Sequence, residues 1–447
     1  MRRTIRKDAL SLRPMTAATR AMRAVTLSVG DLSAARRLYE EQLGMRVVAE
    51  ATVSPADDAL RALWDLPPAT GGRLVWLEQP GATSGAIRLV EFEPRSPIVV
   101  TDGARAYDHG LIKNLDFFTD DVDGAYARMT AAGFPFPAPP VRYPVPWGRG
   151  VFAYEAHSAG FEGVKLSVAR LIGAPRKAFG EAGHETPFTE VAVAAQVVKD
   201  FHAAERFYCD VFDCVPAADT VVENEALIAA LRLPPGTRLR MSFIGPASAV
   251  GGKIGLIAYE GEGVADARSL ASRAQPPHRG AVMMTFECAD ARSRHARALA
   301  CGAAEVAAPS MLDLAPFGSV LASSFRSPDG LLIELIQAGG VPEDIEIDVL
   351  DAALLPDGAH RGIVVPGLGR IVLANVNGHP VALEDRCPHL RGPLSLGAFD
   401  GCRITCPWHG WMIDAPTGAV SGGHGLRVRS FPARVDNGRI LVRHPRP

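Results

Sequence analysis

The sequence is short of several features that mark common classes of protein. Only seven of its 447 residues are cysteine, and this sparse, odd set argues against a secreted disulfide framework and favours a reducing compartment or a metal site. No apolar run approaches the roughly 18 residues that span a membrane. The formal net charge is −2, so the chain has no broad electrostatic attraction to nucleic acid or to anionic membranes. We therefore expect a cytoplasmic globular protein that binds neither.

Motifs for nucleotide cofactors are missing as well. No P-loop sequence is present, and Gly367-Leu-Gly369 is not flanked by the strand and helix that a dinucleotide-binding fingerprint requires. The basic segment 1–21 lacks the apolar core of a signal peptide, and we expect it to be a flexible lead. A flavin or nicotinamide that serves this protein is therefore expected on a separate one.

What the chain does contain is an internal duplication with an offset of 169 residues. Matched pairs include Asp31 and Asp200, Tyr39 and Tyr208, His109 and His278, and Gly133 and Gly302. A match held over this length indicates a duplicated domain, because the period is far too long for a solenoid.

Each half divides again at an aspartate. Asp121 follows Asp31, and Asp290 follows Asp200, by the same 90 residues. Each of these aspartates ends an apolar run and precedes an apolar stripe with helical spacing, which predicts a helix with the aspartate as its N-cap. Gly44 is positioned to end the first helix. The apolar runs predict strands at 24–29, 73–77, 86–92, 115–119, 282–288 and 331–336, so the pattern of strand, helix and further strands occurs four times.

Segments such as "VTLSVGDLSAARRLYEEQLGMRVV" and "SPDGLLIELIQ" resemble the vicinal oxygen chelate superfamily, which includes glyoxalases, type I extradiol dioxygenases and drug-binding resistance proteins. The resemblance covers residues 22–338. It implies an α+β fold of four βαβββ modules in two duplicated pairs, each pair curling a sheet around a pocket. We expect one such domain at 22–170 and the second at 186–338. The fold alone does not identify a reaction, because it hosts many unrelated ones.

The pattern changes at about residue 346 to short strands separated by turn signals such as Asn377-Gly378, which predicts a small all-β domain over 346–444. It contains Cys387-Pro-His389 and Cys406-Pro-Trp-His409, with sixteen residues between His389 and Cys406. Two loops that each offer one thiolate and one imidazole suit a [2Fe–2S] cluster in which two histidines replace two cysteines on one iron. Zinc also accepts two cysteines and two histidines.

The flanking "CPHLRGP" and "CPWHGW" favour the first alternative, because they resemble the Rieske family. That resemblance implies that Cys387 and Cys406 bind one iron and that His389 and His409 bind the other. Rieske proteins of respiratory complexes have an extra cysteine in each loop, where this sequence has Gly392 and Trp408. The domain is therefore more similar to the ferredoxins and oxygenase domains of aromatic-ring metabolism.

The remaining cysteines and one histidine have no motif around them. We expect Cys402 to pack in a strand, and Cys209, Cys214, Cys288 and Cys301 to be ordinary buried thiols. His424 is interpreted as a loop histidine, with cluster tuning or partner binding as the alternative.

The resemblance to the chelate superfamily implies metal ligands at fixed places, namely histidine or glutamine in the first strand of a module and glutamate in the last. The first-strand positions are occupied by Ala24, Asn114, Val193 and Met283, none of which is histidine. In the last strands Glu334 matches and its repeat partner is Lys165. Glu91 is a candidate in the first module, and its third-module counterpart is Ala258 or Glu260. One carboxylate per pocket does not bind iron firmly, so we favour no family-type iron.

An Fe(II) ion in a chelate-type pocket is kept as the alternative because His109 and His278 fall at matching places, five residues before the ligand positions. An odd spacing directs them to the opposite face of a regular strand, unless a bulge intervenes. His157 and Lys165 are further polar candidates, and Lys165 in a pocket could bind an acidic substrate.

Three functions are consistent with this organisation, and the sequence favours the first of them. The first is a dioxygenase-like oxidoreductase whose cluster delivers electrons to a small, aromatic or oxygenated substrate, or to a metal, held by the glyoxalase-like domains. The second is a non-catalytic ligand-binding or docking scaffold with a ferredoxin that serves a separate oxygenase. The third is a glyoxalase-like lyase with a zinc-stabilised tail. The first two require an external NAD(P)H-dependent flavin reductase or ferredoxin, and association with a second copy of the chain stays open.

Overall fold

The computed structural model divides the chain into two compact units, residues 1–339 and 340–447, and each is described by itself. The described residues are 21–145, 150–173, 187–246, 251–338, 345–365, 369–388, 392–421 and 426–444. Almost all of the predicted lead, together with His389 and His424, therefore lies outside the described residues. None of the helices within the described ranges is long and apolar enough to cross a membrane.

The first unit consists of four modules of similar order. The first two contain β1 (Met22–Ser28), α1 (Leu32–Arg36) with a π-helical turn (Arg37–Gln42), β2 (Arg46–Val53), α2 (Asp58–Leu63), β3 (Gly71–Glu78), β4 (Ala86–Glu93), β5 (Leu111–Phe118), α3 (Val122–Ala131), β6 (Val141–Pro144), β7 (Phe152–Phe161) and β8 (Val164–Ile172). The last two contain β9 (Val193–Val197), α4 (Phe201–Phe212), β10 (Val215–Val222), α5 (Glu225–Ala230), β11 (Arg238–Gly245), β12 (Lys253–Glu260), a 3-10 turn (Glu262–Val264), β13 (Gly280–Glu287), α6 (Ala291–Ala300), β14 (Ala304–Leu314), β15 (Gly318–Arg326) and β16 (Leu332–Ala338). The predicted α+β fold of four modules is confirmed.

The four predicted N-caps are confirmed. The side chains of Asp31, Asp121, Asp200 and Asp290 each accept a hydrogen bond from the backbone N–H three residues later. This bond satisfies one of the free donors at the start of a helix. Gly44 adopts a left-handed φ of 72° just after the first helix, as the sequence predicted.

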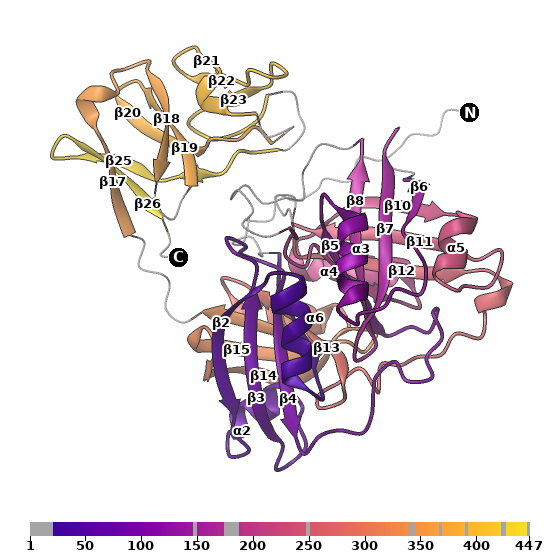
Figure 1. Ribbon diagram of the computed structural model, residues 1–447. Helices are drawn as coiled ribbons and strands as arrows, with labels where there is room; N and C mark the ends of the chain where they lie inside the picture. Colours follow the sequence, from indigo (N-terminus) through magenta and orange to yellow (C-terminus); the bar gives the residue numbers. More distant parts are fainter. Residues whose placement is uncertain are drawn as a thin grey trace, which may run out of the picture. The chain divides into compact units, whose positions relative to one another are not determined.

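The modules do not pair within the two predicted domains, 22–170 and 186–338. One sheet has the strand order β14-β15-β16-β13-β1-β4-β3-β2, and the other has the order β10-β11-β12-β9-β5-β8-β7-β6. The first module thus pairs with the fourth, and the second with the third. In Figure 1 the indigo strands β2–β4 accordingly lie beside the orange strands β14 and β15. The expectation that each half closes on itself was wrong.

The segments 94–110 and 261–279 explain this exchange, because each leads the chain from one sheet to the other. They pair with each other around the buried carboxylate of Asp108, which accepts hydrogen bonds from Arg105 and from the backbone and side chain of Arg268. His109 forms an isolated bridge with Ser269 in this contact. The internal repeat shows which modules are alike. Pairing of the first module with the second and pairing of the first with the fourth would bury the same strand faces, so the sequence alone does not distinguish these two arrangements.

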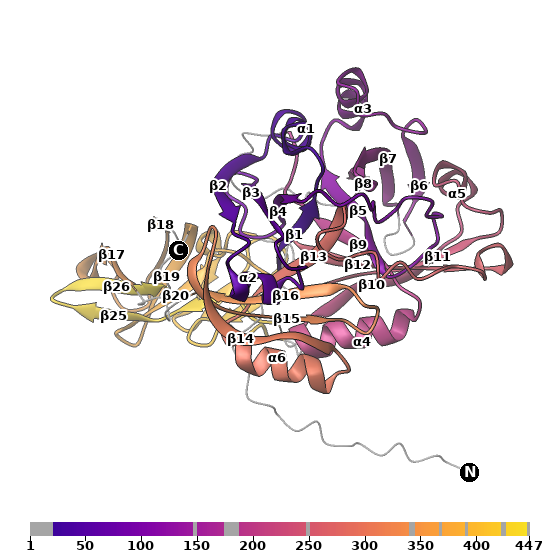
Figure 2. The ribbon, with the colours of Figure 1, turned by 90° about the horizontal axis from the view of Figure 1, so that it is seen from below.

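Each sheet has one face against the helices α1, α3, α4 and α6 and an opposite face that these helices do not contact. A single apolar core joins the helix faces of both sheets and includes residues of α1, α3, α4 and α6. Figure 2 shows α4 and α6 side by side below the strands, and Arg294 of α6 binds Asp213, which follows α4. The opposite faces carry separate clusters, one covered by α2 and one by α5. Ala24 and Met283, two of the predicted first-strand positions, belong to one of these opposite faces, whereas Ala258 belongs to the core on the helix side.

The second unit is all-β, as predicted. Its elements are β17 (Ile345–Asp351), β18 (His360–Val365), β19 (Gly369–Val376), β20 (His379–Glu384), β21 (Ala398–Phe399), β22 (Arg403–Thr405), β23 (Met412–Asp414), β24 (Ser430–Phe431), β25 (Ala433–Asp436) and β26 (Arg439–His444), with 3-10 turns at Ala352–Leu354 and Leu394–Leu396. The turns at Asn377-Gly378 and Asn437-Gly438 have positive φ at both residues, as a type I′ hairpin requires.

Expression of the sequence halves as fragments tests the exchanged pairing. Each of the fragments 21–173 and 187–338 supplies half of both sheets, so each alone exposes unpaired edges at the seams between β1 and β13 and between β5 and β9. We expect either fragment alone to aggregate or to lack a cooperative unfolding transition, and the two coexpressed fragments to elute as a 1:1 complex in size-exclusion chromatography. A folded, monomeric 21–173 fragment would contradict the pairing.

Candidate functional site

The two predicted cluster loops of the second unit pack against each other. Cys387 and Cys406 are both buried, at 1% and 2% exposure, in one apolar cluster. The backbone N–H of Cys387 donates to the carbonyl of Gly392 at 2.9 Å. A Cβ atom on Gly392 would lie 2.9 Å from the Cys406 sulfur and 3.0 Å from the Trp408 ring. The loop carrying Cys387 can therefore approach Cys406 only because position 392 has no side chain.

The second loop presents its histidine at the surface. The Cys406 N–H donates to Trp411 O at 2.7 Å, and the Gly410 N–H donates to Cys406 O at 3.0 Å, so the loop forms a closed turn. His409 lies on the exposed side of this turn, and Trp408 is 57% exposed. Buried thiols and an exposed imidazole on adjoining loops fit a cluster with one protected and one accessible iron. His389 lies outside the described residues, so its place stays a prediction.

The other cysteines correct the sequence analysis in part. Cys402 does not pack in a strand, because it lies exposed in the turn before β22. Cys214 and Cys288 are buried as predicted, whereas Cys209 and Cys301 are only partly buried. Burial raises the pKa of Cys214 to about 12, which leaves it an unreactive thiol.

In the sheet formed by the first and fourth modules, Glu334 is completely buried and fully bonded. Its Oε2 accepts from Arg88 Nη2 at 2.7 Å and from Thr285 Oγ1 at 2.8 Å, and its Oε1 accepts from Arg88 Nη1 at 3.2 Å and from Trp64 Nε1 at 2.7 Å. Arg88 is also completely buried, between the rings of Trp64 and Trp76, which lie 5.1 and 5.2 Å from its guanidinium carbon.

This arrangement does not fit a metal ion. The one carboxylate at the predicted ligand position already has a cation, the guanidinium of Arg88, and both of its oxygens are used. No group of three or more His, Cys, Asp or Glu side chains in the described part of the chain is placed to hold a metal. Sequence analysis missed Arg88, although an arginine inside the apolar strand "AIRLVEF" was the available signal.

Glu91 does not share this site. It lies three residues after Arg88 on β4, and so faces the helix side of the sheet. There its carboxylate accepts from the exposed Arg73 and from the backbone N–H of Leu32, at the start of α1, at 3.3 Å. The register of β4 and β12 makes Ala258, rather than Glu260, its third-module counterpart.

The sheet formed by the second and third modules carries a different set of side chains. Asp116 pairs in register with Ser167, as Thr285 pairs with Glu334, so Ser167 rather than Lys165 takes the place of Glu334. Next to Ser167 on β7 lies His157, whose Nε2 is 3.0 Å from Glu155 Oε1.

Two more side chains complete this group. Tyr143 of β6 donates to the same Glu155 oxygen at 2.9 Å, and Asn114 donates its amide N–H to Asp116. We call Asp116, Glu155 and His157 the acid–base cluster. Only His157 of these three was a candidate from the sequence, although polar residues at alternate positions of "NLDFF" and "YEAHS" were a signal.

The acid–base cluster shifts its own proton equilibria. Burial, then the charge of Glu155, raises the pKa of Asp116 to about 7, against the opposing effect of His157. Burial also acts to raise the pKa of Glu155, but the charge and hydrogen bond of His157 outweigh it and lower that pKa. Burial acts to lower the pKa of His157, but Glu155 raises it above its usual value. The opposite shifts of Glu155 and His157 favour the ion pair between them, and the pKa of the neighbouring Asp116 lies near neutral pH.

His109 and His278 lie in the two connecting segments and not on the site faces. The Nδ1 atom of His278 is 3.0 Å from the carbonyl of Arg273 in the same segment. Burial, then the charge of Lys199, lowers the pKa of His109. The two histidines precede different sheets, so they do not converge on one metal.

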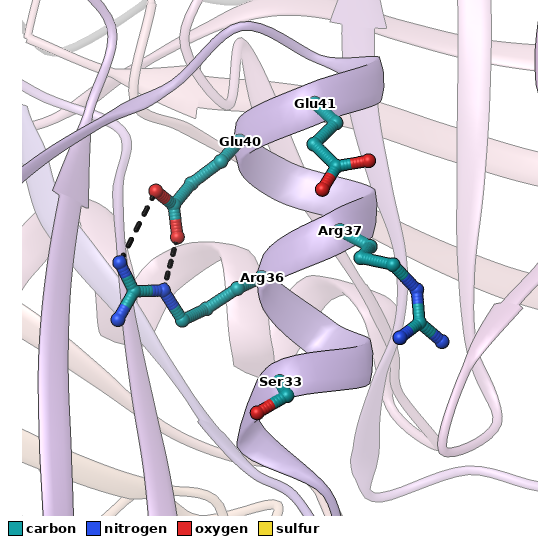
Figure 3. A pocket seen from close by; sticks show the side chains of 5 residues that line it. All are labelled: Ser33, Arg36, Arg37, Glu40 and Glu41. Atoms are coloured by element: carbon teal, nitrogen blue, oxygen red, sulfur yellow. Dashed lines mark hydrogen bonds and ion pairs between the residues drawn. The ribbon is translucent and has the colours of Figure 1, made fainter.

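A hollow on the first helix lies apart from these sites. Figure 3 shows its five lining residues, Ser33, Arg36, Arg37, Glu40 and Glu41, with the Arg36 guanidinium paired to Glu40. All five belong to α1 and the π-helical turn that follows it, and Arg36 also pairs with Glu50 of β2.

Comparison with known proteins yields matches to each unit. Residues 346–432 match the family model of the Rieske [2Fe-2S] domain, and residues 21–162 match that of the Glyoxalase/Bleomycin resistance protein/Dioxygenase superfamily. The ferredoxin component of naphthalene 1,2-dioxygenase/salicylate 5-hydroxylase systems of a Ralstonia species is 31% identical over 98 residues, which are 21% of this chain and 93% of that protein.

Two further proteins match different shares of this chain. Apoptosis-inducing factor 3 of Mus musculus is 31% identical over 104 residues, 23% of this chain, and the match spans only 17% of that relative's length. The crystal structure of glyoxalase I from Zea mays aligns with 72% of this chain and 93% of that chain, at 14% identity and a TM-score of 0.47.

Removal of one partner tests the closed site of Arg88 and Glu334. Arg88→Met leaves Glu334 as an unpaired buried charge, and we expect a loss of about 3–5 kcal/mol in the free energy of unfolding of the first unit. The double variant Arg88→Met/Glu334→Leu should recover most of that loss, because no charge is left buried.

The control is Arg73→Met, which breaks the exposed pair with Glu91 and should lower the free energy of unfolding far less than Arg88→Met does. Urea unfolding followed by tryptophan fluorescence measures the free energy of unfolding of all three variants, since Trp64 and Trp76 report on this site. Equal, small losses for Arg88→Met and Arg73→Met would refute the tightly bonded site.

Proposed function

The chain belongs to the Rieske [2Fe–2S] proteins through its C-terminal domain and joins that domain to a unit of the glyoxalase superfamily, and we propose that it is an electron carrier of an oxygenase-type system. A Rieske [2Fe–2S] cluster exchanges one electron at a time. In this proposal a separate NAD(P)H-dependent reductase supplies the electron, the first unit binds a small organic ligand, and the electron leaves to a separate oxygenase.

One observation favours this role over that of an iron-dependent dioxygenase. Arg88 and Glu334 neutralise each other at the place where the superfamily would hold a catalytic metal. The match to a ferredoxin component over 93% of its length supports the carrier role of the second unit. The whole-protein activities of the oxygenase relatives are not carried over, because the chain matches only parts of them.

In this role the residues of the second unit have separate tasks. Cys387 and Cys406 would hold one iron inside the apolar cluster, and the closed turn after Cys406 would keep the His409 imidazole at the surface. His389 would complete the ligand set. His409 and the neighbouring Trp408 are exposed, so electrons would enter and leave the cluster on this side of the turn.

A second candidate function follows from the acid–base cluster. Reduction of an organic ligand needs protons as well as electrons, and Asp116 and His157 could supply them within the first unit. In that case the ligand bound there would itself be the electron acceptor, as in the dioxygenase-like alternative.

Three cysteine variants test the cluster ligands. Cys387→Ser and Cys406→Ser should lose the acid-labile sulfide and the visible absorption of the cluster, because each removes one thiolate from the same iron. Cys402→Ser is the matched control, since its thiol is exposed outside both loops, and it should keep both signals. Zinc in place of sulfide and iron in the wild-type protein would establish the zinc alternative instead.

Anaerobic reoxidation separates the two functions. The photoreduced protein is mixed with small aromatic acids, and the cluster absorption is followed by stopped flow, with and without a terminal oxygenase. The carrier role predicts that ligands alone leave the cluster reduced and that the oxygenase reoxidises it. Fast reoxidation by a ligand alone would contradict the carrier role and support direct reduction of the ligand.

A further inference from the structure

In the second unit, the loop that carries Cys387 begins and ends at one buried carboxylate. Asp385 lies directly after β20, two residues before Cys387, and its side chain has no exposed surface. Its Oδ1 atom accepts from the backbone N–H of Ser395 at 2.6 Å. Its Oδ2 atom accepts from Ser395 Oγ and from Arg370 Nε, both at 2.6 Å. We call Arg370, Asp385 and Ser395 the loop clamp.

The loop clamp connects three separate segments of the chain. Arg370 belongs to β19, and its carbonyl accepts from the backbone N–H of Asp385 at 3.1 Å. Ser395 belongs to the 3-10 turn that follows the loop. The segment 386–394 between Asp385 and Ser395 is therefore held at both ends, which reduces the number of conformations open to it. Cys387 belongs to this segment, so the clamp restricts the position of its thiol.

The same clamp restricts how the two loops lie against each other. Gly397 follows Ser395 by two residues, and a Cβ atom on Gly397 would lie 2.0 Å from the carbonyl oxygen of Thr405. Thr405 directly precedes Cys406, so the segment held by Ser395 is in close contact with the start of the second loop. One carboxylate thus helps to set the separation between Cys387 and Cys406.

The two charges of the loop clamp are screened by water to different extents. The Asp385 side chain is completely buried, whereas the side chain of Arg370 is 49% exposed. Water weakens the field of an exposed charge much more than that of a buried one. A negative potential therefore remains inside the unit near Asp385. Two residues of chain span at most about 7 Å, so the Cα atom of Cys387 lies within that distance of the Asp385 Cα.

We propose that Asp385 is a positioning residue of the iron–sulfur cluster, which holds the first ligand loop closed through Ser395 and lowers the reduction potential of the cluster through its buried negative charge. The charge around an iron–sulfur cluster is one of the factors that set its potential. Arg370 limits the effect by partly neutralising Asp385. The inference deepens the carrier role proposed above, on whose cluster it rests, by naming residues that set the driving force for electron transfer.

Redox titration of the full-length protein, followed by EPR of the reduced cluster, tests the charge. Asp385→Asn removes the buried anion and should raise the midpoint potential. We expect a change of about tenfold in the equilibrium constant for reduction, which is about 59 mV for one electron. Arg370→Met removes the half-exposed cation and should lower the potential by a smaller amount. Variants that merely loosen the loop have no reason to shift the potential in opposite directions.

The matched controls come from an exposed ion pair in the same unit. Arg439 Nε donates to both carboxylate oxygens of Asp348, at 2.9 and 3.0 Å, and the two side chains are 45% and 50% exposed. Asp348→Asn and Arg439→Met remove the same two charges where water screens both of them. Each should keep the wild-type potential.

Ser395→Ala tests the closure of the loop separately from the charge. It removes the Oγ donor but keeps the backbone N–H and every charge of the clamp. We expect iron release to excess EDTA to be several-fold faster than in the wild type, and the potential to move far less than in Asp385→Asn. Ser430→Ala, at an exposed position on β24, is the matched control and should release iron at the wild-type rate.

An unchanged potential in Asp385→Asn would overturn the inference. Shifts of the same sign in Asp385→Asn and Arg370→Met would do so as well, and so would a wild-type rate of iron release in Ser395→Ala. If Asp385→Asn assembles no cluster, Arg370→Met decides, because a rise or no change in its potential contradicts the role of the buried charge.

The titration uses neither an organic ligand nor an oxygenase. A failure of the protein to pass electrons to an oxygenase therefore leaves this result intact. Unshifted potentials in the clamp variants, in turn, leave the carrier role of the second unit intact.

Discussion

The antiparallel pairing of β1 with β13 is the contact on which the rest of the first unit depends. It joins the first module to the fourth, and so brings Arg88 of one to Glu334 of the other on the same sheet face. Neither residue would be tolerated there alone, because an unpaired buried charge costs several kcal/mol. Together, with Trp64 and Thr285 completing the hydrogen bonds, they form a site that is neutral and closed.

The duplication has produced two sheets with one architecture and two different surfaces. In the first sheet a guanidinium stands where the superfamily pattern would place a cation, so the carboxylate needs no further ligand. In the second sheet the same register positions are a glycine and a serine, and the pair of His157 and Glu155 lies on the neighbouring strand. The first site is closed by its own ion pair, while the second keeps buried polar atoms, Asn114 Oδ1 and Ser167 Oγ, without a hydrogen-bond partner among the described residues. This difference, rather than the fold, carries the functional argument.

Local features of the sequence predicted local features of the structure. The four aspartate caps, the Asn-Gly turns and the spacing of Cys387 and Cys406 depend on a few neighbouring residues, so they could be predicted without knowing the tertiary fold. The exchanged pairing of modules could not, because the alternatives differ only in which distant edges meet. The site of Arg88 and Glu334 was missed for the same reason, since its partners are 246 residues apart. Strand register shifted the counterpart of Glu334 by two residues, from Lys165 to Ser167.

The count of metal per chain tests the central claim most directly, that the protein carries a Rieske cluster and no metal at Glu334. Iron and acid-labile sulfide are measured on protein purified anaerobically and incubated with excess Fe(II) before desalting. A Rieske cluster requires two irons and two sulfides per chain, and the bonded carboxylate of Glu334 predicts that no third iron is retained. A third tightly held iron that is lost in Glu334→Gln would contradict the account, and so would a chain without sulfide.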